Sequence, residues 1–99
     1  MQKMMTKALE SKVPALYAQD GKGSEAIIYA HYFSCFNGWD WYMTEYDPET
    51  REAFGIVKGF ETEMGYFSIE EFESINRSRG FNVIERDLYW RPQAAGTIL

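Results

Sequence analysis

The sequence has almost no cysteine and no long apolar run, and these two absences narrow the class of protein. Cys35 is the single cysteine among 99 residues, so an intrachain disulfide is excluded. No apolar stretch approaches the roughly 18 residues of a membrane span, and no apolar segment follows a basic N-terminus as in a signal peptide. We therefore expect a cytoplasmic protein that does not cross a membrane.

The length limits what the chain can build. Ninety-nine residues predict a single domain, 1–99, with loose ends at 1–5 and 93–99. A chain of this size can bury one core but has little material for a separate, deep substrate cavity. Aromatic residues make up 17% of the chain, which favours a core rich in flat rings.

Negative charge is concentrated in one part of the chain. The net charge is −5, yet ten acidic and two basic residues lie between positions 40 and 73, a local charge of −8. Such a segregated surface repels phosphate and favours basic partners, although an acidic face can also serve solubility alone. The acids that we expect to bind a partner are Glu45, Asp47, Glu49, Glu52, Glu61, Glu63 and Glu70.

An alternating strand pattern changes to a helical one at Ser68. Its hydroxyl can accept a hydrogen bond from the N–H of Glu71, and the Glu71 carboxylate can accept one from the N–H of Ser68, which together form a capping box. An apolar stripe at helical spacing follows, and glycine is typical of a helix end. The pattern predicts a helix over 69–78 that ends at Gly80.

Alternation of side chains predicts strands before and after this helix. The segments concerned are 25–36, 39–46, 53–60, 64–67 and 81–86. Asn37-Gly38 is typical of a type I′ hairpin turn, which favours a strand over the alternative of a helix for 25–36. Gly55 and Gly59 leave room on one face for a helix or a tryptophan.

These segments predict an α+β fold. Thr6 can cap a first short helix that ends at Pro14, and the aromatic segment 87–92 should pack on the sheet. We expect an antiparallel β-meander of about five strands, with two short helices packed on one face.

Few residues offer catalytic or metal chemistry. His31 and Cys35 would meet on a helix, but on the favoured strand their Cα atoms lie about 13 Å apart, which argues against a Cys/His pair. One histidine and one cysteine are also too few for a zinc site. We predict no catalytic residue, no metal and no cofactor.

The triplet Glu85-Arg86-Asp87 is the densest charged group between apolar residues. On a strand Glu85 and Asp87 share a face, so one of the three should turn inward and pair elsewhere. A structural ion pair is the plainer interpretation, and a small hydrolase centred on Glu85 and Asp87 is an alternative.

Exposed rings beside a cationic patch would suit single-stranded nucleic acid. The candidate rings are Trp39, Trp41, Tyr42, Tyr89 and Trp90, and the candidate cations are Arg77, Arg79, Arg86 and Arg91. Asp40 and Glu45 interrupt any basic groove near the tryptophans, so nucleic-acid binding is the disfavoured alternative.

Four stretches together resemble a known family. They are Trp39-Asp40-Trp41-Tyr42-Met43-Thr44-Glu45, Phe54-Gly55-Ile56-Val57, Gly65-Tyr66-Phe67-Ser68-Ile69-Glu70-Glu71 and Ile84-Glu85-Arg86-Asp87-Leu88-Tyr89-Trp90. With Pro14 and Leu16-Tyr17, they are similar to the bacterial family called domain of unknown function 2958. The resemblance implies a small cytoplasmic protein of plasmids, conjugative elements or phages, often encoded near antirestriction genes. It implies no activity and no catalytic residue.

The sequence therefore predicts a non-enzymatic binding protein of a mobile genetic element. Its acidic face would bind a basic protein of the host or of the element, with a role in countering host defence. We expect a monomer or a homodimer.

Overall fold

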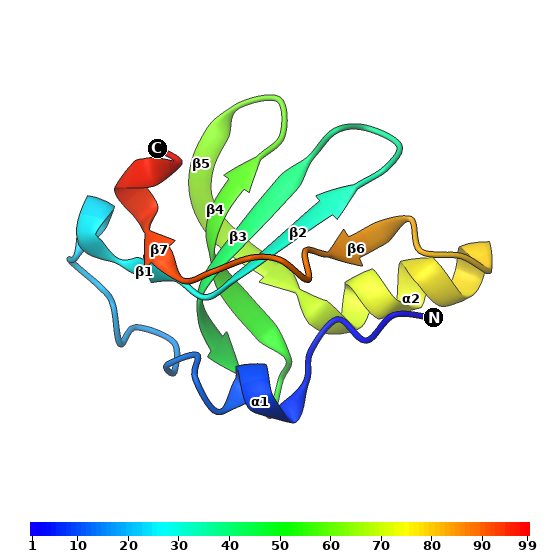
Figure 1. The fold of residues 1–99 in the computed structure, drawn as a ribbon, viewed down its shortest axis with the longest axis horizontal. Coiled ribbons are helices and arrows are strands. Elements are labelled where there is room, and N and C mark those ends of the chain that lie inside the picture. The colour runs from blue at the N-terminus through cyan, green and yellow to red at the C-terminus, as the bar shows by residue number, and fades with distance from the viewer.

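A computed structural model describes residues 1–99 and shows an α+β fold, as expected (Figure 1). The main sheet has five antiparallel strands in the order β5-β4-β3-β2-β6, and a second sheet pairs β1 with β7. The strands are β1 (Ile27–Ile28), β2 (Ala30–Ser34), β3 (Asp40–Asp47), β4 (Glu52–Lys58), β5 (Thr62–Ser68), β6 (Ile84–Arg86) and β7 (Gln93–Ala94). The helices are α1 (Lys7–Glu10), α2 (Ile69–Arg79) and the 3-10 turns η1 (Gly23–Glu25) and η2 (Ala95–Thr97).

Strands β2 to β5 form the predicted meander, and α2 carries the chain back to the other edge. There β6 pairs with β2, and the buried side chain of Asn76 fixes this return. Its amide nitrogen donates to the carbonyl of Ile84 at 2.9 Å, and its amide oxygen accepts from the N–H of Ile84 at 3.0 Å. Strand β5 is left as one edge of the sheet.

The predicted strand 25–36 is confirmed in part, because it divides at Tyr29 and serves two sheets. Ile28 lies in the core on one face of the main sheet, whereas Ala30 and Tyr32 lie in the core on the other. The turn that follows is not type I′, since of Asn37 and Gly38 only the glycine has a positive φ. Residues 35–39 form a longer loop instead.

The strand-to-helix change at Ser68 is confirmed, but only half of the capping box forms. The Ser68 hydroxyl accepts from the N–H of Glu71 at 3.1 Å, and α2 ends before Gly80, whose φ is 79°. The Glu71 carboxylate makes no bond back to Ser68. Ser68 is also the last paired residue of β5, opposite Glu52, so its backbone belongs to the ladder as well as to the cap.

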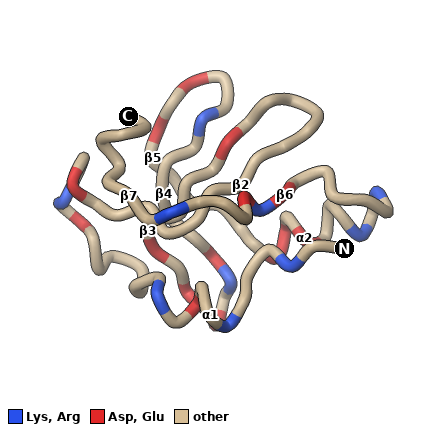
Figure 2. The backbone as a smooth tube through the Cα atoms, viewed as in Figure 1, with Lys and Arg blue, Asp and Glu red and all other residues tan.

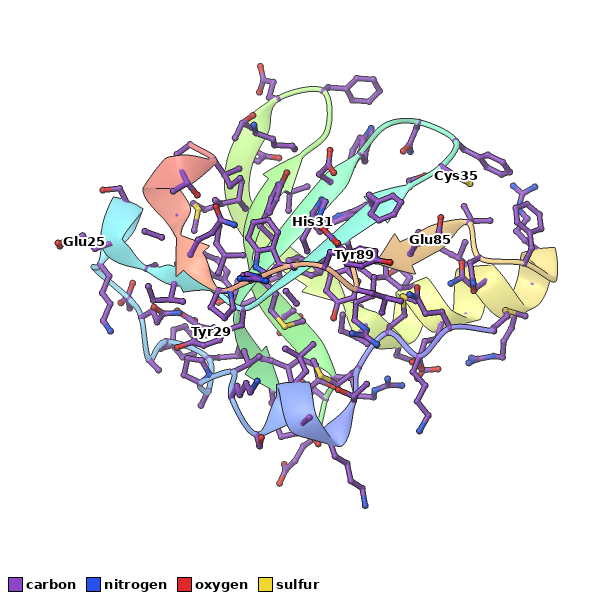
Figure 3. All side chains as sticks on the ribbon, in the orientation of Figure 1. Glu25, Tyr29, His31, Cys35, Glu85 and Tyr89 are labelled. Atoms are coloured by element: carbon purple, nitrogen blue, oxygen red, sulfur yellow. The ribbon has the colours of Figure 1, made fainter.

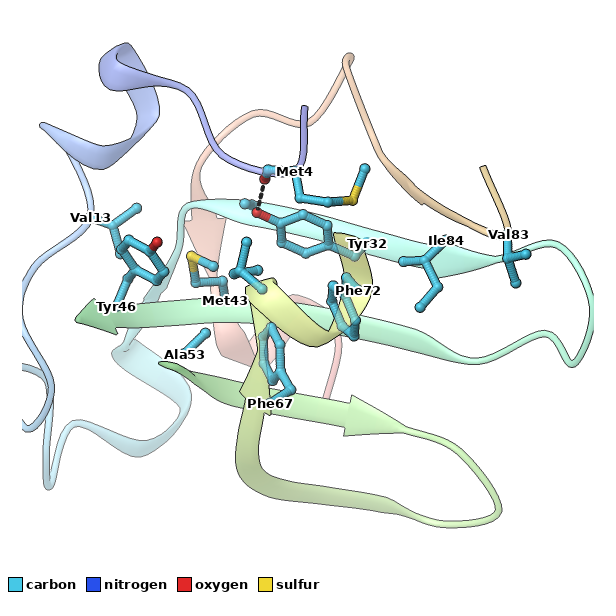
Figure 4. Close-up of a cluster of buried hydrophobic side chains, with 12 residues drawn as sticks. Met4, Val13, Tyr32, Met43, Tyr46, Ala53, Phe67, Phe72, Val83 and Ile84 are labelled. Atoms are coloured by element: carbon cyan, nitrogen blue, oxygen red, sulfur yellow. Dashed lines mark hydrogen bonds between the residues drawn. The ribbon is translucent and has the colours of Figure 1, made fainter. Parts of the chain in front are cut away.

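Both faces of the sheet carry a core. The larger core lies between the sheet and α2 and contains 12 buried residues, among them Tyr32, Phe67 and Phe72 (Figure 4). Burial raises the pKa of Tyr32, whose hydroxyl donates to the carbonyl of Met4 at 2.6 Å. The smaller core, on the opposite face, consists of Ala26, Ile28, Tyr42, Ile56 and Ala95.

Both chain ends, for which the sequence predicted loose segments at 1–5 and 93–99, contribute buried residues to the cores. Met4 and Ala95 are both 0% exposed. The Gln2 side chain donates to the carbonyl of Arg86 and accepts from its N–H. At the other end, β7 pairs with β1 and so covers the smaller core. This pairing could not be predicted from the sequence, because a strand of two residues is too short to show alternation.

The first helix is shorter than predicted. Thr6 caps it as expected, by accepting from the N–H of Leu9 at 3.2 Å, but the helix ends at Glu10 instead of reaching Pro14.

Gly59 makes room for a tryptophan, as the sequence predicted, because a Cβ there would lie 2.6 Å from the Trp39 ring. None of the helices has the length and apolar character needed to cross a bilayer.

We predict that Ser68→Ala lowers the free energy of unfolding by about 1 kcal/mol, because Ala cannot accept from the N–H of Glu71. The measurement is urea unfolding followed by circular dichroism. Ser74→Ala, at an exposed position inside α2, is the matched control and should change stability by less than about 0.5 kcal/mol. Equal effects of the two substitutions would show that the cap is unimportant.

Candidate binding site

A β-bulge in β3 turns Glu45 toward the sheet face that carries the smaller core. Tyr42 pairs with Ile56 and Glu45 pairs with Phe54, so the step from one pair to the next takes three residues on β3 and two on β4. Side chains alternate between faces along a regular strand, and the extra residue shifts that alternation. Without the bulge, Glu45 would lie on the same face as Met43, beneath α2.

Gly55 makes this bulge possible. A Cβ atom at Gly55 would lie 1.7 Å from the carbonyl oxygen of Tyr42, a distance that no side chain tolerates. The neighbouring residue Thr44 is 1% exposed, and its hydroxyl donates to the carbonyl of Phe54 at 3.1 Å. The sequence predicted a close approach at Gly55, but it did not show that the approaching group is the bulged strand itself.

Glu45 is buried, with 4% of its surface exposed, and its carboxylate accepts from two backbone N–H groups. One oxygen accepts from Tyr17 at 2.6 Å and the other from Gln19 at 3.1 Å. It takes part in none of the ion pairs of the structure. A carboxylate can accept about four hydrogen bonds, so about two acceptor positions of Glu45 remain free.

The side chain of Gln19 ties the loop before β1 to the bulge. Its amide nitrogen donates to the carbonyls of Thr44 at 2.8 Å and Ile27 at 2.9 Å, and its oxygen accepts from the N–H of Ile27 at 2.7 Å. Gln19 is 6% exposed, so these bonds form away from water. The carbonyl of Thr44 in the bulge therefore gains a partner from a side chain.

Tyr17 has a backbone conformation that is uncommon for a bulky residue. Its φ is 73°, in the left-handed region, and the hydrogen bond from its N–H to Glu45 helps hold it there. Its ring is 69% exposed and its hydroxyl lies 3.3 Å from that of Tyr66. This hydrogen bond raises the pKa of Tyr66 to about 12.

These side chains surround a cavity of about 380 Å³. Glu45, Phe54 and Tyr66 are paired in register across β3, β4 and β5, and the rings of Phe54 and Tyr66 meet edge to face at 4.9 Å. Tyr17, Asp20 and Met64 complete much of the wall, and no Lys, Arg or His lines it. The arrangement suits a ligand with positive charge and a flat or apolar part.

Of the residues at this site, the sequence indicated only Glu45, and as a surface acid. Tyr17 was noted only as part of a family resemblance, and Gln19 gave no signal. The glycine inside β4 was the one available signal, because a glycine in a strand interior often marks a bulge.

The other predicted acids divide between the two ends of the sheet (Figure 2). Asp47, Glu49 and Glu52 lie at the β3–β4 turn, whereas Glu61 and Glu63 lie at the β4–β5 turn, about 20 Å away along β4. The Asp47 carboxylate accepts from the N–H of Glu49 and the hydroxyl of Thr50, within its own turn.

Glu70 is the predicted acid with its charge already paired. Its carboxylate accepts from Arg51 at 2.7 Å and from Arg77 at 3.1 Å. Arg51 also binds Glu73 at 2.7 Å. This hydrogen bond lowers the pKa of Glu73 against the opposing effect of burial.

In the triplet 85–87, Asp87 is the residue that turns inward and pairs. Its carboxylate lies 3.0 Å from Nδ1 of His31, and the Asp40 carboxylate lies 2.7 Å from Nε2 of the same ring. The ring stacks on Tyr42 at 4.5 Å, which makes His31 a clamp between two strands and the 87–92 segment.

The remaining triplet residues do not join this clamp. The Arg86 guanidinium donates to the carbonyl of Lys3, and Glu85 forms no ion pair. Figure 3 shows Glu85 on β6 and Cys35 at the hairpin loop, both apart from His31. No group of three or more His, Cys, Asp or Glu side chains is placed to hold a metal ion.

The candidate rings for nucleic-acid binding lie on different parts of the surface. Trp41 packs on Phe72 beneath α2, whereas Trp90 donates to the carbonyl of Ile28 on the opposite face. Tyr89 is 91% exposed. The candidate cations are not one patch either, since Arg77 pairs with Glu70 and the Arg86 guanidinium binds the N-terminal segment.

We predict that Gly55→Ala destabilises the fold by about 3 kcal/mol, because the added methyl group collides with backbone. Gly65→Ala is a matched control. The two glycines face each other in register, but a Cβ at Gly65 would lie 3.9 Å from Val57 Cγ2, an ordinary contact. Thermal unfolding of both variants compares them, and equal melting temperatures would contradict the rigid bulge.

We predict that the stability difference between the native protein and Asp87→Asn depends on acid pH. Burial raises the pKa of Asp87, but hydrogen bonds from His31 and from the N–H of Tyr89 outweigh it and lower the pKa below its ordinary 3.8. Because the folded-state pKa is depressed, the stabilisation should be full above about pH 5 and be lost as pH falls through the folded-state pKa. Urea unfolding from pH 7 to pH 3 tests this, and a pH-independent difference would contradict it.

Comparisons with known proteins agree with the resemblance seen in the sequence. No curated protein and no solved structure matches the chain. The model of one family, described as protein of unknown function (DUF2958), matches residues 3–97, which is nearly the whole chain. The protein therefore belongs to the DUF2958 family.

Proposed function

We propose that the protein is a non-enzymatic binding protein that presents acidic side chains along the β5 edge to a basic protein partner. The observation that carries this proposal is a set of exposed acids without cationic partners at both ends of that edge. Glu61 and Glu63 lie at the start of β5, and Glu52 lies opposite its last residue, Ser68. None of the three takes part in an ion pair.

Only some of the acids predicted from the sequence are available to bind a partner. Glu45 is buried and Glu70 is paired, so neither offers a free charge at the surface. Glu49 remains exposed beside Glu52, while Asp47 is occupied within its turn. The available charges thus lie in two groups, which suits an elongated basic partner that runs along β5.

The edge itself supports binding to a polypeptide. β5 has a partner strand on one side only, and Met64 and Tyr66 are 43% and 49% exposed. A seven-residue edge with free backbone groups and exposed apolar side chains is a template for another strand. Acidic residues at its ends would discourage pairing between two copies of this chain and favour a basic guest.

The setting that we propose is the one implied by the family resemblance. The protein would act in the cytoplasm as an accessory protein of a mobile genetic element and counter host defence by occupying a basic protein. Nucleic-acid-binding proteins present basic surfaces, and a negatively charged surface can compete with phosphate for them.

We predict that Glu61→Lys with Glu63→Lys slows association with a basic peptide at least about threefold, because exposed charges act mainly on the association rate. The probe is the immobilised peptide Lys-Thr-Thr-Arg-Thr-Thr-Lys, and the measurement is surface plasmon resonance over a salt series. Glu10→Lys with Glu85→Lys is the matched control, since either pair changes the net charge from −5 to −1 and Glu85 lies on the opposite edge strand.

The same measurement can reject the proposal. If both double variants slow association equally, only net charge matters and the β5 edge has no special role. Native protein should also pass through heparin and single-stranded DNA columns. Retention on either column would instead favour the nucleic-acid alternative.

A further inference from the structure

The cavity beside β5 opens next to the only long free edge of the main sheet. Met64 and Tyr66 belong both to the edge strand and to the cavity wall, so a strand added to β5 would border the cavity directly. Neighbouring strands lie about 4.8 Å apart, and side chains in register point to the same face. A guest residue opposite Tyr66 would therefore extend the row that Glu45, Phe54 and Tyr66 already form.

The cavity is lined by two carboxyl side chains and by no cationic side chain. The Glu45 carboxylate is bound by two backbone N–H groups and by no cation, and Asp20 adds a second carboxylate to the wall. Burying a charge is costly unless an opposite charge compensates it. No Lys, Arg or His is among the lining residues, so a cation from a partner would meet no opposing charge there.

The shape of the wall selects among cations. The rings of Tyr17, Phe54 and Tyr66 line the cavity, and a guanidinium group can stack flat on such rings while it donates to a carboxylate. A lysine ammonium would gain the charge attraction but less of the stacking. The free acceptor positions of Glu45 likewise match a group with several donors.

We propose that the cavity receives an arginine side chain from an extended segment of the basic partner, and that this segment pairs with β5 as an added strand. The inference rests on the proposed function, because it assumes a basic protein partner. It adds where on the structure that partner binds and which of its side chains is recognised. The bulge at Thr44 contributes to this site because it places Glu45 at the cavity and not beneath α2. Tyr17, fixed by Glu45, forms the outer wall.

The test compares three forms of the peptide Lys-Thr-Thr-Arg-Thr-Thr-Lys by fluorescence anisotropy. The first is unmodified, the second has citrulline in place of arginine, and the third has alternate backbone nitrogens methylated. Citrulline keeps the shape of arginine but not its charge. We expect it to weaken binding about tenfold, within the range of a partly desolvated cation–π contact. Methylation should abolish strand pairing and weaken binding at least as much.

Two variants of the protein locate the effect. Tyr66→Ser removes an exposed ring from the wall, and Tyr17→Gly removes another while placing glycine where φ is positive. In each variant the tenfold preference for arginine over citrulline should fall to about twofold or less, because ring and guanidinium act together. Circular dichroism establishes that both variants are folded, and glycine at position 17 is expected to preserve stability.

The outcomes separate this inference from the proposed function. If citrulline and arginine peptides bind equally while Glu61→Lys with Glu63→Lys still slows association, the acidic edge stands and the arginine cavity is wrong. If the methylated peptide binds as tightly as the unmodified one, strand addition is wrong. If no peptide binds at millimolar concentration, both proposals fail.

Discussion

The bulge at Thr44, opposite Gly55, is the constraint on which most of one sheet face depends. The extra residue moves Glu45 across the sheet, and Glu45 then binds the N–H groups of Tyr17 and Gln19. Gln19 in turn satisfies the carbonyl of Thr44 and holds β1 through Ile27. A regular strand would place Glu45 beneath α2, where a carboxylate would meet apolar side chains and lose these donors. One inserted residue thus fixes a loop, a strand and a cavity together.

The two faces are stabilised in different ways. On one face α2 packs apolar side chains such as Ile69 and Phe72 against the sheet, so burial of apolar area supplies the stability. On the other face the cover consists of β1, β7 and the 87–92 segment, above the smaller core of five buried residues. Hydrogen bonds also hold these segments, including the one from Trp90 to the carbonyl of Ile28 and those of the His31 clamp. Binding surfaces are commonly made by loops held on a rigid scaffold, and the second face has that construction.

Most of the fold could be predicted from local sequence patterns, whereas most of the candidate site could not. Alternation showed the strands of the meander, and Ser68 and Gly80 marked both ends of α2, because each of these signals acts within a few residues. The pairing of β7 with β1 and the packing of Met4 are long-range, and two-residue strands carry no period to detect. Glu45 was expected at the surface because of its charge, whereas it is buried at a bulge that depends on a glycine at the right register of the partner strand.

The distribution of acids shows why local charge alone is a weak guide to a binding surface. Because ten acids lie between positions 40 and 73, the sequence predicted a single acidic face. The strands of a meander reverse direction, however, so successive turns lie at opposite ends of the sheet. Structure then separates acids by what each already binds: Glu70 and Glu73 neutralise Arg51, and Asp40 and Asp87 hold His31. What remains free is Glu45 within the cavity and the exposed acids at the ends of β5. A partner that recognised this chain would need positive charge along the length of a strand and one side chain that enters the cavity beside β5. That requirement is more selective than net positive charge alone.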